Sequence, residues 1–269
     1  ISLGMEKNSG FKLTLPIARR AMAAVAYGDI LMLLGNQTRP YEVNPGETNA
    51  LINRWIDELS EEFMAGKSFA ARQVKARFRE IAASFDAVPV EKVPKVKVGI
   101  VGEIYVKYSA LANNNLEKFL EGEGCEIMVP GLMGFLFYCV LNNIRDIELY
   151  GGSAVRKKAV EALYAYLRQF ETDLIETVSA YPKYTAPAPT EQVMRLAEPV
   201  IGTGCKMGEG WFLTGEIMEL LEHGYENVIC AQPFGCLPNH IIGKGMIRKI
   251  RNMLPWANIV PIDYDPGQH

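Results

Sequence analysis

The chain has 269 residues and a formal net charge of −3, so it has no general positive field that would attract nucleic acid or an anionic membrane. Apolar residues make up 49% and charged residues 22%, which is typical of a globular protein with a buried core. Charges or glycines interrupt every apolar stretch well before about 18 residues, and this excludes a predicted membrane span.

The five cysteines are odd in number and irregularly spaced, so they do not predict a disulfide framework. Residues 1–7 also lack the basic and apolar regions of a secretory signal, and we therefore expect a reducing, cytoplasmic location. Cys125 and Cys139 are expected in the core, and the sequence does not decide the role of Cys205. Because the chain does not begin with methionine, we expect it to be a piece of a longer protein.

Residues 14–87 show apolar positions at helical spacing and predict three helices. A turn over 39–46 separates the first helix from the second, Gly66 ends the second, and Ser68 is positioned to cap the third. Two prolines in 89–94 cannot continue a helix and predict a linker. We therefore divide the chain into a helical region, 1–90, which is a remnant of a neighbouring lobe or packs against one, and a second domain, 91–269.

The second domain is predicted to be α/β. Short β-branched runs predict strands at 96–101, 125–129, 227–230 and 258–262, with helical segments between them that leave room for crossovers. A helical stretch at about 131–200 is interpreted as an insertion. The predicted fold is a Rossmann-like parallel sheet of about four strands with flanking helices and a helical N-terminal region.

Ligands of open α/β sheets bind at the carboxyl ends of the strands, and three polar segments follow predicted strands. The first, 102–109, contains Glu103, Tyr105 and Lys107, which are candidates for a catalytic cluster. A solvated loop that caps a helix is an equally good interpretation. The last, 263–267, contains two carboxylates, which are compatible with orienting a ligand or with a turn.

The segment between these two, 232–240, contains Cys236 between two prolines, close to a helix start. Backbone N–H groups and the helix dipole favour a thiolate there, which suits a nucleophile or a metal–sulfur bond. A single loop cysteine is more often inert, and His240 is more often a capping or surface group than a ligand. Cys230 and Cys236 do not have zinc-ribbon spacing, and no complete phosphate-binding motif occurs in the chain.

Several short motifs are spread over nearly the whole chain. They include Arg39-Pro-Tyr-Glu-Val-Asn-Pro-Gly-Glu47, Val98-Gly-Ile-Val-Gly-Glu-Ile-Tyr-Val-Lys-Tyr-Ser109, Asn113-Asn-Asn-Leu-Glu117, Gly208-Glu-Gly-Trp-Phe-Leu-Thr-Gly-Glu216, Cys230-Ala-Gln-Pro-Phe-Gly-Cys236-Leu-Pro-Asn-His240, Gly243-Lys-Gly245 and Ile262-Asp-Tyr-Asp-Pro-Gly267. Taken together, they resemble the 2-hydroxyacyl-CoA dehydratase D-component-like family. The resemblance is strongest to the lobe that follows the ATPase modules of large CoA-substrate-specific enzyme activase proteins.

This resemblance implies two Rossmann-like lobes with helical insertions and a [4Fe–4S] or double-cubane cluster held by cysteine thiolates. An ATP-driven activator would supply one electron for radical elimination of water from a 2-hydroxyacyl-CoA. Matching by residue makes Cys236 the first and Cys230 the second expected cluster ligand, with Glu103, Tyr105 and Lys107 lining the facing cleft. The implied partners are an activator module or another lobe of the same protein, and an acyl-CoA.

The chain also departs from that family. It has no cysteine before Cys125, so ligands of the earlier lobe are missing, and it lacks the phosphate motifs of the activator ATPase. We therefore expect no ATP hydrolysis. Two functions stay open: a cluster-binding lobe of a dehydratase-like lyase, or a non-catalytic module that docks an activator or acyl-CoA partner without a cluster. A nucleotide-binding α/β domain is a third and more remote interpretation.

Overall fold

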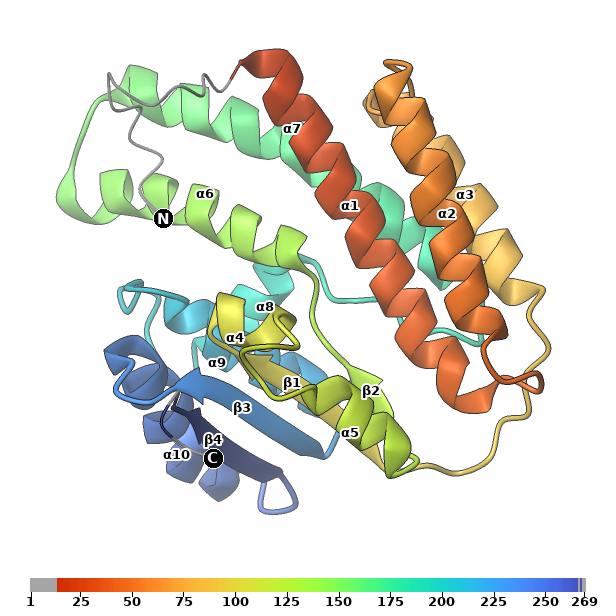
Figure 1. Ribbon diagram of the computed structural model, residues 1–269. Helices are drawn as coiled ribbons and strands as arrows, with labels where there is room; N and C mark the ends of the chain where they lie inside the picture. Colours follow the sequence, from red (N-terminus) through yellow and green to blue (C-terminus); the bar gives the residue numbers. More distant parts are fainter. Residues whose placement is uncertain (1–13, 266, 268–269) are drawn as a thin grey trace.

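The fold was analysed in a computed structural model that describes residues 14–265 and residue 267 (Figure 1). Its four strands form one sheet in the order β2-β1-β3-β4, and every pairing is parallel. The strands are β1 (Lys97–Gly102), β2 (Glu126–Met128), β3 (Asn227–Pro233) and β4 (Asn258–Tyr264). The predicted α/β class, with a parallel four-stranded sheet and a helical N-terminal region, is confirmed.

Helices cover both faces of the sheet. On one face, α4 (Ile104–Tyr108) and α5 (Leu116–Gly122) bury a small apolar cluster that includes Ile100 and Ile127. On the other face, α9 (Gly210–Glu222) lies against β1 and β3, with α8 (Thr190–Ala197) packed on it and α10 (Ile247–Met253) beside it. The approach is close, since a Cβ atom at Gly99 would lie 2.6 Å from a methyl of Leu220. Every residue of α9 from Gly210 to Leu221 is buried, so α9 is the central helix of the molecule.

The remaining long helices form a second, all-helical layer, seen above the sheet in Figure 1. They are α1 (Leu15–Thr38), α2 (Glu47–Met64), α3 (Ala71–Asp86), α6 (Leu132–Tyr150) and α7 (Ala154–Ser179), with a 3-10 turn at Arg39–Tyr41. One continuous apolar core joins α1, α3, α6, α7 and α9, so the N-terminal helices pack against the predicted insertion. Within the described residues, no helix combines the length and apolar character needed to cross a membrane.

Three local predictions were wrong. The residue before α3 that serves as its N-cap is Ala70, whereas Ser68 has a φ of 60° and directs its hydroxyl to the Glu62 carboxylate. The segment predicted as one helix, 239–253, begins with a π turn at Asn239–Gly243 and a 3-10 turn at Lys244–Met246, and only Ile247–Met253 is α-helical. Cys139, predicted in the core, is exposed on α6.

Candidate functional site

Three segments meet at the carboxyl edge of the sheet. They are the start of α4 after β1, the loop that leads into α9, and the turn after β3. The carboxylate of Glu209 joins them, because Oε2 accepts a hydrogen bond from Asn239 Nδ2 at 2.9 Å and Oε1 accepts one from the Ile104 backbone N–H at 3.4 Å. Burial raises the pKa of Glu209, which is only 7% exposed. This edge is where ligands bind in open parallel sheets.

Cys236 lies in the turn after β3, where Gly235 adopts a φ of 76° that favours glycine. The backbone N–H of Cys236 donates to the Pro233 carbonyl at 3.1 Å, and its Sγ accepts a hydrogen bond from Asn239 Nδ2 at 3.3 Å. The side chain is partly exposed. Its thiol is therefore positioned by one amide donor and remains reachable from outside.

Large apolar side chains are exposed on the same three segments. The loop before α9 touches the turn after β3, since a Cβ atom at Gly208 would lie 2.9 Å from the Cβ of Pro238. We call the exposed side chains the apolar rim: Tyr105, Met207, Phe234, Leu237 and Ile241. Where such side chains form a contiguous patch, they mark an interaction surface.

His240 is engaged by its own turn and by β4. Its Nδ1 lies 2.9 Å from the Cys236 carbonyl, and its Nε2 lies 3.3 Å from Oδ1 of Asp263. Gln232 donates to the same carboxylate at 2.6 Å and Lys244 lies 3.2 Å from it, and these two contacts hold the pKa of Asp263 below its usual range. The predicted segments after β3 and β4 thus come together, with His240 in a structural network.

The three residues predicted as a catalytic cluster occupy three different environments. Glu103 is the N-cap of α4, where its side chain accepts a hydrogen bond from the Val106 N–H at 2.8 Å. Tyr105 is 63% exposed, whereas Lys107 is completely buried. Lys107 therefore does not line an open cleft as expected, and a catalytic role for the three residues stays a prediction.

Lys107 forms an ion pair with Glu216 on α9, with Nζ and Oε1 3.0 Å apart and both side chains at most 2% exposed. Burial raises the pKa of Glu216, and the Lys107 ammonium opposes that change. The Asn113 side chain stabilises the end of α4 by donating to the carbonyls of Val106 and Lys107. A pair desolvated to this degree depends on both partners, because either charge alone would be buried without compensation.

Cys230 lies inside β3, paired in register with Val101, and is 1% exposed. Burial raises the pKa of its thiol to about 12, so without a bound metal the side chain is a neutral thiol at neutral pH. A ligand role for Cys230 stays a prediction, and its burial within β3 means that β3 would have to open for a metal to reach it. Only Cys236, of the two, is available at the carboxyl edge.

The cluster implied by the family resemblance needs a set of thiolates. In the part of the chain that the structure describes, no group of three or more His, Cys, Asp or Glu side chains could hold a metal ion. The described residues alone therefore do not fit a complete [4Fe–4S] site, and Cys236 offers a single ligand.

The sequence-based prediction overlooked three buried carboxyl groups: Glu209, the N-cap of α9, and Glu216 and Glu219 on α9 itself. Each of them is at most 7% exposed, and their neighbours on the helix are almost all apolar. That pattern was a usable signal, because charged residues are rarely buried without a partner or a function.

Comparisons of the chain with family models, with curated proteins and with solved structures find no match.

Proposed function

We propose that this chain is the docking lobe of a 2-hydroxyacyl-CoA dehydratase-like iron–sulfur protein. In this proposal Cys236 supplies one thiolate to a [4Fe–4S] or double-cubane cluster whose other ligands come from a second lobe. The observation that carries the proposal is the position of Cys236, partly exposed in the turn after β3 and close to the apolar rim. The resemblance of the short motifs to that family is consistent with the same assignment.

The surroundings of Cys236 suit a ligand at an interface. The amide of Asn239 donates to Sγ and would fix the direction of a metal–sulfur bond, as hydrogen bonds around metal ligands do. Docking of a second lobe onto the apolar rim would exclude water from the thiolate. The described residues provide no group of three or more metal ligands, so we assign no electron-transfer step to this chain alone.

The test is anaerobic reconstitution of the chain with iron, sulfide and an excess of a small thiol that fills the missing ligand positions. We expect bound iron and a visible charge-transfer absorption that Cys236→Ser removes. Cys139→Ser and Cys205→Ser are matched controls, because both cysteines are exposed, and they should leave the absorption unchanged. Equal iron binding by all three variants and the unchanged chain would contradict the role of Cys236.

A second candidate function is a docking module that carries no cluster, and the apolar rim favours it independently of any thiolate. This function predicts binding of an acyl-CoA or an activator without bound iron. Calorimetric titration of the iron-free chain with a medium-chain acyl-CoA tests the first of these. Phe234→Ser and Leu237→Ser should weaken binding, since both side chains are 69% exposed. Unchanged binding by both variants would exclude the apolar rim as the docking surface.

A further inference from the structure

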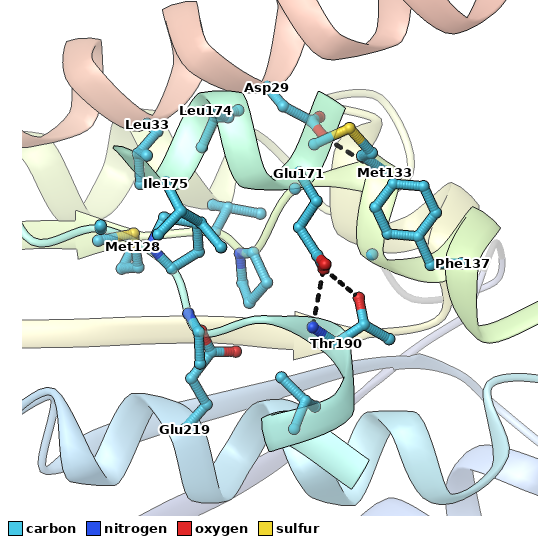
Figure 2. A pocket seen from close by; sticks show the side chains of 18 of the residues that line it. Asp29, Leu33, Met128, Met133, Phe137, Glu171, Leu174, Ile175, Thr190 and Glu219 are labelled. Carbon is cyan, nitrogen blue, oxygen red and sulfur yellow. Dashed lines mark hydrogen bonds between the residues drawn. The ribbon is translucent and has the colours of Figure 1, made fainter. Parts of the chain in front are cut away.

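A partly enclosed cavity lies at the carboxyl end of β2, between the helical layer and α9 (Figure 2). The centre of a water molecule can reach about 70 Å³ of it, which is room for about five waters. The segment Ala186–Ala188 and the side chain of His223 are partly exposed at its border. Most of the lining is apolar: Leu33, Met128, Val129, Pro130, Met133, Phe137, Leu174, Ile175, Val193, Phe212 and Leu220.

Three carboxyl groups also line this cavity, and they come from three helices. Asp29 lies on α1, Glu171 on α7 and Glu219 on α9, and none of the three is more than 8% exposed. Figure 2 shows Glu171 entering from the helical layer and Glu219 from the opposite side. No lysine or arginine is among the lining residues. The cavity therefore combines a mostly apolar lining with carboxyl groups that enter from opposite sides.

Backbone groups hold the carboxyls in place but leave oxygen atoms free. Asp29 uses both oxygens to accept hydrogen bonds from the Leu132 and Met133 N–H groups, at 2.9 and 2.7 Å. Glu171 accepts from the N–H and hydroxyl of Thr190 at 2.7 and 2.6 Å, both through Oε1. Glu219 accepts from the Ala188 N–H at 2.6 Å through Oε1. The hydrogen bonds of Glu171 and Glu219 within the described residues all go to Oε1, and none is found to Oε2 of either side chain.

We propose that this cavity binds a small organic cation, a primary ammonium group on an apolar body of about five carbon atoms, and that Glu219 is its principal ligand. The free Oε2 atoms provide acceptors for an ammonium group, which has three donors and no acceptor. The apolar residues, among them Leu33, Phe137 and Leu174, would surround the hydrocarbon part. An anionic ligand would meet three acidic groups and no basic one. This inference does not depend on Cys236.

The ionisation of Glu219 gives the proposal a distinctive pH dependence. Burial raises its pKa to about 8, and Glu216 on α9 and Glu171 on α7 add to that increase. The Ala188 N–H and the Lys107 ammonium on α4 oppose it. At pH 7 the side chain is mostly a neutral acid, so binding of a cation must expel its proton. Affinity should therefore rise about tenfold for each pH unit well below pH 8, rise about fivefold between pH 7 and pH 8, and level off above pH 8.

Asp29 and His223 border the same cavity and have different titration ranges. Burial raises the pKa of Asp29 to about 6, so Asp29 is already mostly ionised at pH 7. Burial lowers the pKa of His223, which leaves its imidazole neutral at neutral pH. Neither group gains or loses a proton between pH 7 and pH 8 to a large extent. Burial also raises the pKa of Glu171, so the change in affinity over that interval reports Glu219 together with Glu171, and the Glu219→Gln variant separates the two.

The experiment is calorimetric titration of the full chain with n-pentylamine, n-pentanol and pentanoate, which share one apolar body and differ in charge. We expect n-pentylamine to bind with a Kd on the order of 1 mM at pH 8. Glu219→Gln should weaken it about tenfold or more, because a charge-assisted hydrogen bond is lost. Glu222→Gln, the same change at an exposed site at the end of α9, is the matched control.

A site for a neutral apolar ligand or for an anion would give a different order of affinities from a cation site. If n-pentanol or pentanoate binds as tightly as n-pentylamine, or if the amine does not bind at all, the proposal is overturned. Equal amine binding by Glu219→Gln and Glu222→Gln also overturns it. The glutamine in Glu219→Gln keeps an oxygen that can accept from the Ala188 N–H. A circular dichroism melt identifies any variant that fails to fold. In that case Glu171→Gln serves as the second test, with the same expected loss of amine affinity. Cys236→Ser should leave amine binding unchanged, so the cation site and the docking lobe can be refuted independently of each other.

Discussion

Replacing Glu219 by glutamine should remove a large part of the pH dependence of stability. Burial raises the pKa of this carboxyl from 4.5 to about 8, so the folded state holds its proton more tightly than the unfolded state does. For an acid with a raised pKa, the free energy of unfolding is highest below pH 4.5. It falls as the pH rises from 4.5 to about 8 and is constant above that. Glutamine does not ionise, so this position causes no loss in the free energy of unfolding of Glu219→Gln over the same interval.

The magnitude follows from the two pKa values. Each factor of ten in an ionisation constant corresponds to 1.36 kcal/mol, so ionised Glu219 destabilises the folded state by about 5 kcal/mol at high pH. Between pH 5 and pH 9 the unchanged chain should lose about 4 kcal/mol relative to Glu219→Gln. The side chain is 6% exposed, so solvent screens this cost very little. At pH 5 the two proteins should differ by about 1 kcal/mol at most, because glutamine still accepts from the Ala188 N–H.

The assay is urea unfolding followed by circular dichroism at pH 5, 7 and 9, at one ionic strength. The quantity compared is the difference in the free energy of unfolding between Glu219→Gln and the unchanged chain. Glu222→Gln, at an exposed position on the same helix, should show no such change with pH. A difference for Glu219→Gln that is the same at all three pH values would refute the burial argument.

Three further predictions concern the sheet and its carboxyl edge. Lys107→Met should lower the free energy of unfolding by about 3–5 kcal/mol, because Glu216 would be left buried and unpaired. The double variant Lys107→Met with Glu216→Leu should recover most of that loss in the same urea assay. Iodoacetamide should alkylate Cys236 in the folded chain while Cys230 reacts only after unfolding, as peptide mass mapping with and without urea would show. Gly102→Ala should prevent a stable fold, since its Cβ atom would lie 1.8 Å from the backbone oxygen of Ala231 at a φ of 146°; a normal thermal melt would contradict this.

The fold was largely predictable because the strands carry an unambiguous local signal. The run Val98–Val101 is short, apolar and β-branched, and prolines at 89 and 94 separate it from the preceding helices. The ends of elements were less predictable. Ser68 has the chemistry of a helix cap, but the Glu62 carboxylate accepts its hydroxyl hydrogen bond and the cap falls two residues later. Tertiary contacts of this kind are not encoded in the neighbouring sequence.

The location of the candidate site was predictable from the sequence, but the contacts between its residues were not. The carboxyl ends of β1 and β3 were identified from strand order, and Cys236 does lie there. The partner of Lys107 could not be identified, because Glu216 lies 109 residues away and helical periodicity does not distinguish a buried carboxylate from an exposed one. The acidic cavity depends on α1, α7 and α9 meeting in space, which no local pattern reports.

The helix α9 explains why one of its carboxyls stays protonated. Residues three apart on a helix are neighbours, so Glu216 and Glu219 lie close together on one buried helix, with Glu209 at its N-cap. Lys107 pairs with Glu216 and lies near enough to Glu219 to lower its pKa only partly. With one ammonium among these acids, a second ionised carboxylate would be buried without a counter-charge. Glu219 therefore keeps its proton, and a cation that enters the cavity from outside would supply the missing charge.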